Sequence, residues 1–461
     1  MRKRLLTITL AVCTMITSLA VGSMPVGAAS KSENVYWPKG PKVASKSAIV
    51  MEANSGAILY EKNVHDKHYP ASITKIMTTL LALENCNLDE TVTFSENAVY
   101  KTEGTLIGRD VGEKMTLEQT LYAVMLGSAN ECAYATAEHV AGNITEFVKL
   151  MNNRAKEIGC VDTHFNNPHG LPDKKHYTSA YDMAMISKEA LKNETFKKIT
   201  GTKTYVIPPT NKHDDETYLV NHHAMLNYYH TGKYIYEDCI GGKTGYTSVA
   251  GNTLVTYAER NGMTLICVVM KSHDEEHYQD TTKLLEYCFN NFQAYNVSQY
   301  DNTYNMESVK NAVNFQTAIP YLSLDENAYV ILPKTASFED VTSKVSMKEE
   351  KGNVGGWVNY QYGDRQIGTA NILISKKNIE AYNFGNNKAK EGKIIELSWL
   401  RILMMIVLLA MVVGSIIGVI YLKNNMNLIR YNMQRRRQHR ENDISFEGRV
   451  VRRRRFFRRR R

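Results

Sequence analysis

The stretch from Ile402 to Leu422 restricts the fold of this chain most, because it contains no charged residue over 21 positions. An α-helix rises 1.5 Å per residue, so a helix of this length matches the roughly 30 Å hydrocarbon core of a bilayer. We therefore predict a transmembrane helix over residues 402–422. The parts of the chain before and after it must then fold on opposite sides of a membrane.

Residues 423–461 form a basic tail, with fifteen Lys and Arg side chains against three acidic ones. Because positive segments stay in the cytoplasm, we place the tail there and the larger part of the chain outside the cell membrane, with a single pass. The net charge of +9 arises in this tail, so it gives no reason to expect a nucleic-acid partner. The runs Arg452–Arg455 and Arg458–Arg461 are suited to anionic lipid headgroups, although a solvated tail that only sets the topology explains them as well.

The N-terminus has the pattern of a signal peptide. Basic residues at positions 2–4 precede an apolar stretch, and small residues at positions 26–29 suit cleavage. We predict that residues 1–29 are removed during export. A retained membrane anchor is the weaker alternative, because hydroxyl residues dilute the apolar stretch.

Cysteine usage leaves two possibilities open. One of the seven cysteines lies in the predicted signal peptide, and the exported part keeps Cys86, Cys132, Cys160, Cys239, Cys267 and Cys288. An even number in an oxidising compartment permits disulfides, but unpaired thiols in a core fit the sequence equally well.

The start of the exported part changes from polar to structured. Residues 30–44 are polar and contain two prolines, which predicts a linker. The apolar runs 48–51 and 57–60, separated by turn residues, predict a β-hairpin. Apolar residues at helical spacing follow Pro70, so a helix is expected to begin there with Ser72 in its first turn.

Residues 45–294 as a whole predict an α+β domain with strands at both ends of a helical middle. Helices are expected at 117–125, 130–140, 146–158, 180–191 and 275–292. Strands are expected at 251–259 and 263–270, joined by an Asn-Gly turn. Thr178 and Ser179 are candidate caps of the helix that follows them.

Residues 297–375 consist of short β-branched or aromatic runs separated by Gly, Asp and Asn. This pattern predicts a small β-rich domain, for which a passive spacer is the simplest role. Residues 376–401 would then form a stalk that leads to the membrane helix.

Three short motifs occur in a fixed order along the exported part: Ser72-Ile-Thr-Lys75, Ser128-Ala-Asn130 and Lys243-Thr244-Gly245. Each motif alone is common by chance and indicates no more than a polar residue on a helix or loop. Together they form the set of penicillin-recognising serine enzymes, with Ala129 in place of the usual aspartate.

The first motif has a chemical logic of its own. Ser72 and Lys75 are three residues apart on a helix, so both lie on one face and the amine can reach the hydroxyl. A lysine acts as a base only when its pKa is lowered, and burial beside a second cation such as Lys243 would lower it. The helix N-terminus favours negative charge that develops on Ser72.

The chain resembles the low-molecular-mass penicillin-binding proteins that act as D-alanyl-D-alanine carboxypeptidases. The resemblance covers residues 47–374 and includes the longer phrases at 70–77, 167–171 and 242–247. It implies a penicillin-binding or β-lactamase-like transpeptidase domain, followed by a β-rich domain that can hold the catalytic unit away from the membrane. It also implies peptidoglycan stem peptides as substrates and β-lactams as covalent inhibitors.

The resemblance assigns catalytic roles to residues of the first two motifs. Ser72 would attack the carbonyl between the two terminal D-alanines, and Lys75 would accept its proton. Ser128 would relay a proton to the leaving amine, so that an acyl-enzyme forms and water then releases the shortened peptide. Asn130 would orient Lys75 and the substrate amide.

The third motif would bind the substrate. By the same resemblance, Lys243 and Thr244 hold the terminal carboxylate, and Gly245 lets the strand approach the peptide closely. The backbone N–H groups of Ser72 and Tyr246 would form the oxyanion hole.

No cofactor or metal is expected, because serine chemistry activated by lysine needs none. His164, His169 and His176 lack the HExxH spacing of a zinc site, although His169 could affect deacylation. His222 and His223 are interpreted as scaffold.

Three other functions remain open from the sequence. A β-lactamase shares the motifs but needs rapid deacylation, and Asp173 is the only acid in the loop 165–175. A D,D-endopeptidase would use the same site on cross-linked peptides. A non-catalytic β-lactam receptor would need an output domain, for which the basic tail is too short.

Overall fold

The computed structural model describes residues 36–229, 231–301, 322–347 and 354–374. The predicted signal peptide, stalk, transmembrane helix and basic tail lie outside these residues. Among the helices that are described, none combines the length and the apolar character needed to cross a bilayer.

A five-stranded antiparallel sheet organises the larger part of the structure, in the strand order β2-β1-β9-β8-β7. Its strands are β1 (Ser47–Glu52), β2 (Ile58–Lys62), β7 (Cys239–Thr247), β8 (Gly251–Arg260) and β9 (Met263–Ser272). Both predicted hairpins are confirmed. The Asn-Gly turn between β8 and β9 places Asn261 and Gly262 at positive φ values of 53° and 76°, as this type of turn requires.

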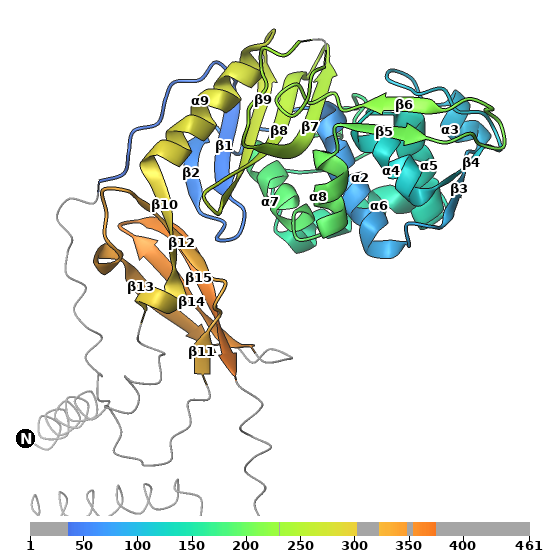
Figure 1. The fold of residues 1–461 in the computed structure, drawn as a ribbon. Coiled ribbons are helices and arrows are strands. Elements are labelled where there is room, and N and C mark those ends of the chain that lie inside the picture. Colours follow the sequence, from blue (N-terminus) through green and yellow to red (C-terminus); the bar gives the residue numbers. More distant parts are fainter. Residues whose placement is uncertain (1–35, 230, 302–321, 348–353, 375–461) are drawn as a thin grey trace, which may run out of the picture. The chain divides into compact units, whose positions relative to one another are not determined.

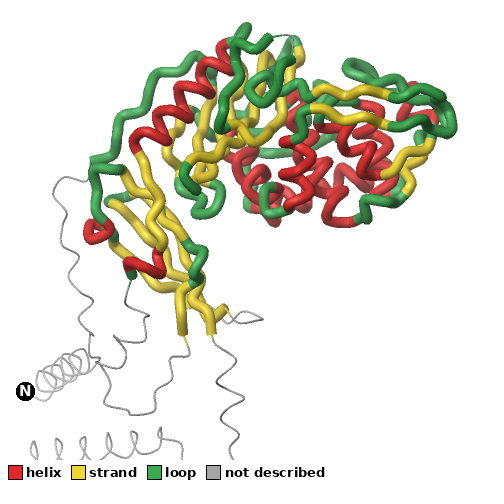
Figure 2. Tube along the Cα trace, in the orientation of Figure 1, coloured by secondary structure: helices red, strands yellow, loops and turns green. Residues whose placement is uncertain are grey.

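Alternate side chains of the sheet enter two different cores, since successive residues of a strand point to opposite faces. Ile49 and Met51 of β1 join the larger core with the helical middle of the chain. Ala48 and Val50 join a second core on the opposite face, beneath helix α9 (Glu276–Asn291). Figures 1 and 2 show the resulting layers, with α9 on one side of the sheet and the helices of the helical middle on the other.

The helical middle contains every helix expected there. Its helices are α2 (Lys75–Asn85), α3 (Glu96–Tyr100), α4 (Leu117–Met125), α5 (Asn130–Ala141), α6 (Ile144–Ile158), α7 (Ala180–Ala190) and α8 (Glu194–Gly201). Ser179, and not Thr178, caps α7 by accepting a hydrogen bond from the Asp182 N–H. The short helices α3 and α8 were not predicted, because neither has enough turns to produce a clear helical period.

Two short strand pairs flank these helices and were also not predicted. They are β3 (Thr91–Thr93) with β4 (Lys114–Thr116), and β5 (Thr204–Ile207) with β6 (Thr217–Val220). Strands of three or four residues carry too few positions for an alternating pattern to emerge from the sequence.

The β-rich part begins with β10 (Phe292–Asn296), which pairs with β12 (Tyr329–Pro333). After the short helix α10 (Val297–Tyr300), a second sheet has the order β11-β15-β14-β13. Its strands are β11 (Leu322–Leu324), β13 (Thr342–Met347), β14 (Val354–Tyr362) and β15 (Arg365–Ile374). The runs 328–332, 356–362 and 369–374, which the sequence predicts as strands, lie in β12, β14 and β15. Strand β10 lies before the expected start of the domain at residue 297.

The segment from Tyr36 to Ala44 differs from a free linker, because it packs along the domain. The Tyr287 and Tyr60 hydroxyls donate hydrogen bonds to the carbonyls of Pro38 and Pro41. Trp37 lies against Phe292, with ring centroids 4.9 Å apart. Proline and polar content predicted the lack of regular structure here but not these tertiary contacts.

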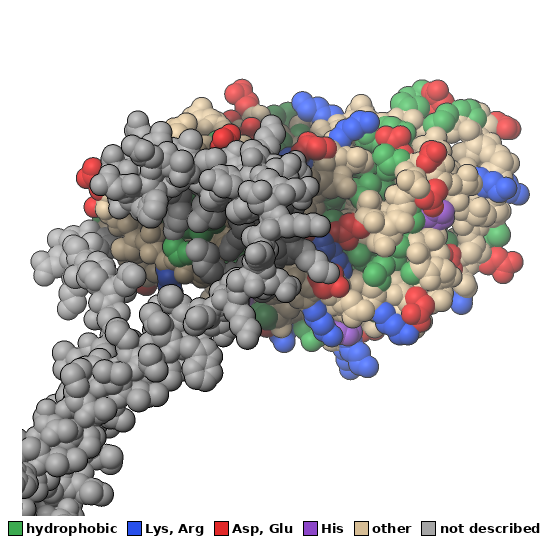
Figure 3. Space-filling model, turned by 90° about the horizontal axis from the view of Figure 1, so that it is seen from below, with side chains coloured by type: hydrophobic (Ala, Val, Ile, Leu, Met, Phe, Trp, Pro, Cys, Tyr) green, Lys and Arg blue, Asp and Glu red, His purple; other side chains and the backbone are tan. Residues whose placement is uncertain are grey.

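The six cysteines of the described part are free thiols, and four of them are buried. Of the two possibilities left open by the sequence, the structure therefore has unpaired cysteines. On the face seen in Figure 3, acidic and basic side chains are interspersed, which agrees with the absence of a large net charge before the tail.

Leu284 tests the second core, because its side chain is fully buried between α9 and the sheet. We expect Leu284→Ala to reduce the free energy of unfolding by about 2–5 kcal/mol through lost burial and the cavity left behind. The exposed neighbour Lys283 provides the matched control. Lys283→Ala should change the free energy of unfolding by no more than about 0.5 kcal/mol. Urea denaturation measures both, and equal effects would contradict this packing.

Candidate active site

Ser72 lies in a tight turn at the start of the predicted helix. Residues Ala71–Thr74 form a 3₁₀ turn that leads directly into α2, of which Lys75 is the first residue. Ala71 has a φ of 51°, a left-handed backbone that is costly for a residue with a Cβ. Surrounding contacts must therefore hold this turn in place, which fixes the direction of Ser72.

The Lys75 amine has three oxygen neighbours and is fully buried. Its Nζ lies 3.0 Å from Ser72 Oγ, 2.6 Å from Asn130 Oδ1 and 2.9 Å from the His169 carbonyl oxygen. A neutral amine has two N–H groups and one lone pair. Since the amide and carbonyl oxygens can only accept, they take the two N–H groups, and the lone pair is left for the Ser72 hydroxyl.

Two electrostatic effects favour the neutral form of Lys75. Burial lowers the pKa of Lys75 well below its ordinary value of 10.5, and the positive charge of Lys243 lowers it further. Burial also lowers the pKa of Lys243, to about 7. The charge of Lys243 therefore opposes protonation of Lys75, in the direction that the sequence predicts.

The second motif joins α4 to α5 and carries another strained residue. Ser128 is buried with a φ of 57°, and Asn130 is the first residue of α5. The Asn130 Nδ2 group donates to the carbonyl of Glu103, which leaves Oδ1 directed at Lys75. Ala129 lies in the hydrophobic core, where an aspartate would need a polar partner, so the departure from the usual motif suits this packing.

The loop before the second motif is held by Glu131, a residue that sequence analysis missed. Glu131 Oε1 accepts hydrogen bonds from the N–H groups of Ile107 and Gly108, at 2.6 and 3.0 Å. The Asn130 N–H donates to the carbonyl of Thr105 in the same loop. Burial raises the pKa of Glu131, and these backbone donors oppose that shift. No motif marks this carboxylate as important.

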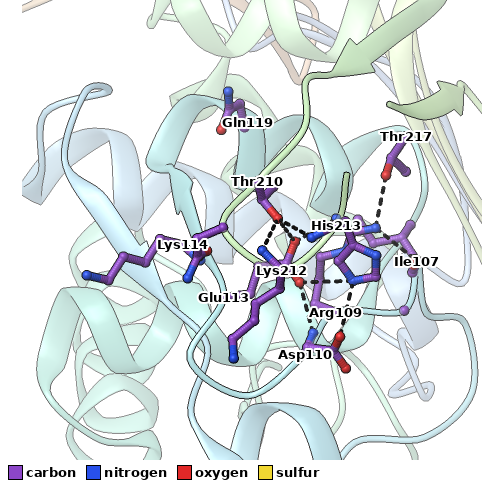
Figure 4. A network of polar contacts seen from close by, with 12 residues as sticks. Ile107, Arg109, Asp110, Glu113, Lys114, Gln119, Thr210, Lys212, His213 and Thr217 are labelled. Carbon is purple, nitrogen blue, oxygen red and sulfur yellow. Dashed lines mark hydrogen bonds and ion pairs between the residues drawn. The ribbon is translucent and has the colours of Figure 1, made fainter. Parts of the chain in front are cut away.

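A buried ion pair extends the support of this loop (Figure 4). Arg109 donates to Glu113 at 2.9 Å, and both side chains are almost completely buried. Glu113 also accepts a hydrogen bond from the hydroxyl of Thr210, while Arg109 donates to the hydroxyl of Thr217. The connection between β5 and β6 is thereby tied to the loop beside the second motif.

The third motif occupies β7, which forms the edge of the sheet beside the start of α2 (Figure 1). Lys243 is buried and its Nζ donates to the carbonyl of Thr244, whereas Tyr246 is 67% exposed. A Cβ at Gly245 would lie 2.8 Å from the Ser72 nitrogen and 2.5 Å from Thr253 Oγ1. Only glycine therefore permits this approach of β7 to Ser72.

Thr253 connects the same two segments and was also missed. Its hydroxyl lies 2.9 Å from the carbonyl oxygen of Pro70 and 3.2 Å from that of Gly245. The side chain belongs to β8, so the sheet is joined directly to the residue that precedes the Ala71 turn. A threonine in a strand carries no sequence signal for such a role.

The loop 167–171 supplies a backbone oxygen to the site. Gly170 has a φ of 94°, and a Cβ there would lie 1.8 Å from the Ala71 carbonyl oxygen. The close fit of this loop against the turn places the His169 carbonyl on Lys75. Residues 167–171 are part of the family resemblance in the sequence, but the sequence pattern does not reveal that the backbone carbonyl of His169 contacts Lys75.

His169, His176 and His223 each make a hydrogen bond to the protein through a ring nitrogen, whereas His223 Nδ1 is buried without a partner among the described residues. His176 Nε2 lies 2.9 Å from Thr74 Oγ1, and burial lowers the pKa of His176 to about 3. His169 Nδ1 accepts from the Leu171 N–H, and burial followed by the Lys75 charge lowers its pKa to about 3. His223, with a pKa lowered to about 4 mainly by burial, packs beside Thr256. These three histidines are neutral parts of the scaffold.

Comparison with known proteins adds an independent line of evidence. The family model described as D-alanyl-D-alanine carboxypeptidase matches residues 34–274, which include all three motifs. The carboxypeptidase DacF of Bacillus subtilis is 34% identical over 66% of this chain and 77% of its own length. DacA of Haemophilus influenzae is 30% identical over 75% of this chain and 88% of its own length.

Solved structures show the same architecture. Penicillin binding protein 5 from Haemophilus influenzae superposes with a TM-score of 0.56 at 27% identity, over 73% of this chain and 98% of that one. The Streptomyces K15 DD-transpeptidase gives a TM-score of 0.50 at 30% identity, over 55% of this chain and 100% of that one. Since the family model covers more than half of the chain and contains the whole lysine–serine constellation, the chain belongs to the D-alanyl-D-alanine carboxypeptidase family.

Proposed function

We propose that this protein is a serine D-alanyl-D-alanine carboxypeptidase that removes the terminal D-alanine from peptidoglycan stem pentapeptides and thereby limits cross-linking. The observation that carries the proposal is the Lys75 amine, 3.0 Å from the Ser72 hydroxyl with two carbonyl-type oxygens on its other sides. This arrangement provides a nucleophile and its base without a metal or cofactor.

Acylation follows from this geometry. Ser72 Oγ bonds to the carbonyl carbon of the penultimate D-alanine while its proton passes to Lys75 Nζ. The bond between that carbon and the nitrogen of the last D-alanine then breaks, and the nitrogen receives a proton by way of Ser128. The terminal D-alanine leaves, and the shortened peptide remains as an ester on Ser72. The same attack on a β-lactam ring would leave a covalent inhibitor on the serine.

Deacylation restores the enzyme. A water molecule adds its oxygen to the ester carbon, the bond to Ser72 Oγ breaks, and the proton of the water returns the serine to its hydroxyl form. Lys75 is positioned to accept and deliver these protons because it is buried and its pKa is lowered well below the ordinary value of 10.5.

The third motif supplies the substrate contacts in this proposal. Lys243 and Thr244 hold the terminal carboxylate, and Asn130 orients the peptide amide as well as Lys75. The N–H groups of Ser72 and Tyr246 stabilise the negative oxygen of the tetrahedral intermediate. In support, Gly245 allows β7 to pass close to the Ser72 nitrogen, so both N–H groups belong to adjoining backbone segments.

The location of the enzyme rests on sequence features at both chain ends. We propose that residues 1–29 direct export and that residues 402–422 anchor the protein in the cell membrane with the catalytic domain outside. The basic tail would then contact anionic lipid on the cytoplasmic face. The β-rich part and the stalk would place the site at a distance from the membrane.

Removing the nucleophile provides the first test. We expect Ser72→Ala to reduce release of D-alanine from a pentapeptide ending in D-alanyl-D-alanine by on the order of 10⁴- to 10⁶-fold. The exposed Ser343 of the β-rich part gives a matched control, and Ser343→Ala should leave the rate unchanged. No release by the unmodified protein would contradict the proposed activity, and preferential cleavage of cross-linked dimers would instead indicate an endopeptidase.

The pH profile tests the two lysines. The value of kcat/KM should rise with pH as Lys75 loses its proton, and fall again as Lys243, with a pKa of about 7, loses the charge that holds the carboxylate. Lys243→Gln removes a positive charge that lowers the pKa of Lys75, so the rising limb of kcat/KM should move to higher pH and KM should increase. Lys243→Arg keeps the charge and should leave the rising limb in place.

An unmoved rising limb in Lys243→Gln would show that Lys243 does not tune the base. Measurement of kcat and KM between pH 4 and pH 10 separates the two effects, because loss of carboxylate binding raises KM where Lys243 of the unmodified protein is charged, whereas tuning of the base moves the rising limb of kcat/KM.

Membrane attachment is testable by fractionation. We expect the full chain to stay in the membrane pellet after an alkaline carbonate wash, because 21 uncharged residues span the bilayer. A chain that lacks residues 402–461 should appear in the soluble fraction and retain its carboxypeptidase activity. Equal partitioning of the two chains would argue against the anchor.

A further inference from the structure

Cys86, Glu90 and His139 form a cluster outside the active site. The potential ligand atoms of these three side chains all lie within 4.8 Å of one another, and each residue is partly exposed. His139 Nε2 is 2.9 Å from Glu90 Oε2. A thiol, a carboxylate and an imidazole form a ligand set typical of zinc, and partial exposure leaves room for a metal ion to enter from solvent.

The backbone at this cluster is fixed by the fold. Cys86 ends α2, and its N–H donates to the carbonyl of Ala82. The carbonyl of Glu90 accepts a hydrogen bond from the Leu117 N–H at the start of α4. His139 lies in the last turn of α5. The three candidate ligands therefore come from packed elements whose relative positions are set before any ion binds.

Hydrogen bonds also orient the carboxylate. Glu90 Oε1 accepts from the N–H and the side-chain amide of Asn87, at 2.7 and 3.1 Å. These contacts occupy one oxygen and leave Oε2 facing His139. Support of this kind for a liganding carboxylate is common in metal sites.

We propose that Cys86, Glu90 and His139 bind one divalent transition-metal ion, with Zn²⁺ the best match, at the ends of α2 and α5 remote from the active site. The ion replaces the direct contact between His139 and Glu90, and the Cys86 thiol loses its proton to solvent as its sulfur bonds to the metal. Water completes the coordination, since the protein supplies three ligands.

The position gives the ion a structural role. Lys75 and Asn130 begin α2 and α5, whereas Cys86 and His139 lie at the opposite ends of the same helices. Eleven residues of α2 correspond to about 16 Å, so the ion is too distant to take part in serine chemistry. It instead joins the far ends of the two helices that carry the base and its amide partner.

Cobalt provides a direct spectroscopic probe. We expect the reduced, metal-free full chain to bind Co²⁺ with a thiolate-to-metal charge-transfer band in the near ultraviolet, and Zn²⁺ to abolish that band by displacement. Binding should release about one proton per ion near neutral pH. Zn²⁺ should also raise the melting temperature, because it binds the folded chain.

Variants assign the band to these residues. Cys86→Ser and His139→Gln should lose the charge-transfer band and the shift in melting temperature. Cys160→Ser is the matched control, because Cys160 is also partly exposed but lies at the end of α6, and it should keep both signals. Circular dichroism of each variant without metal verifies that it is folded.

The proposal is overturned if the folded chain gives no band, if Cys86→Ser retains it, or if Cys160→Ser loses it. None of these measurements depends on D-alanine release, so failure of the metal site and failure of the proposed enzymatic function are distinguishable.

Discussion

A buried lysine amine is expensive to keep charged, and the site is arranged around the way in which Lys75 avoids that cost. Two oxygens that can only accept hydrogen bonds take its N–H groups, and the nearby charge of Lys243 further disfavours a third proton. The remaining lone pair is directed at Ser72. The positions of Asn130, the His169 carbonyl and β7 can all be understood as requirements of this one uncharged amine.

Several of these positions depend on left-handed backbone conformations or on close backbone approaches, both of which are unfavourable for residues with a Cβ. Ala71 and Ser128 have left-handed φ values next to or within the motifs, and Gly170 and Gly245 bring backbone segments closer than a Cβ would allow. Such strain persists only where surrounding contacts over-determine it. Here the contacts include Thr253 on one side of the turn and the loop 167–171 on the other.

The sequence predicted the parts of this structure that depend on local pattern. The hairpins, the helix after Pro70 and the three motifs depend on short-range spacing, and the helix geometry alone places Lys75 beside Ser72. Glu131, Thr253 and the His169 carbonyl were missed because their importance arises from contacts between distant segments. The same reason explains why residues 36–44 looked like a linker, since only the folded domain shows what Tyr60 and Tyr287 bind.

The close fit of Gly170 against Ala71 has a consequence for when the serine becomes reactive. The turn, the second motif, the loop and β7 are separated by up to about 170 residues, and the burial and the Lys243 charge that lower the pKa of Lys75 exist only where these segments are packed together. In the unfolded chain Lys75 is an ordinary solvated cation and Ser72 an ordinary alcohol. The reactivity of the serine is thus a property of the assembled tertiary structure, and the short motif that contains Ser72 and Lys75 does not provide it alone.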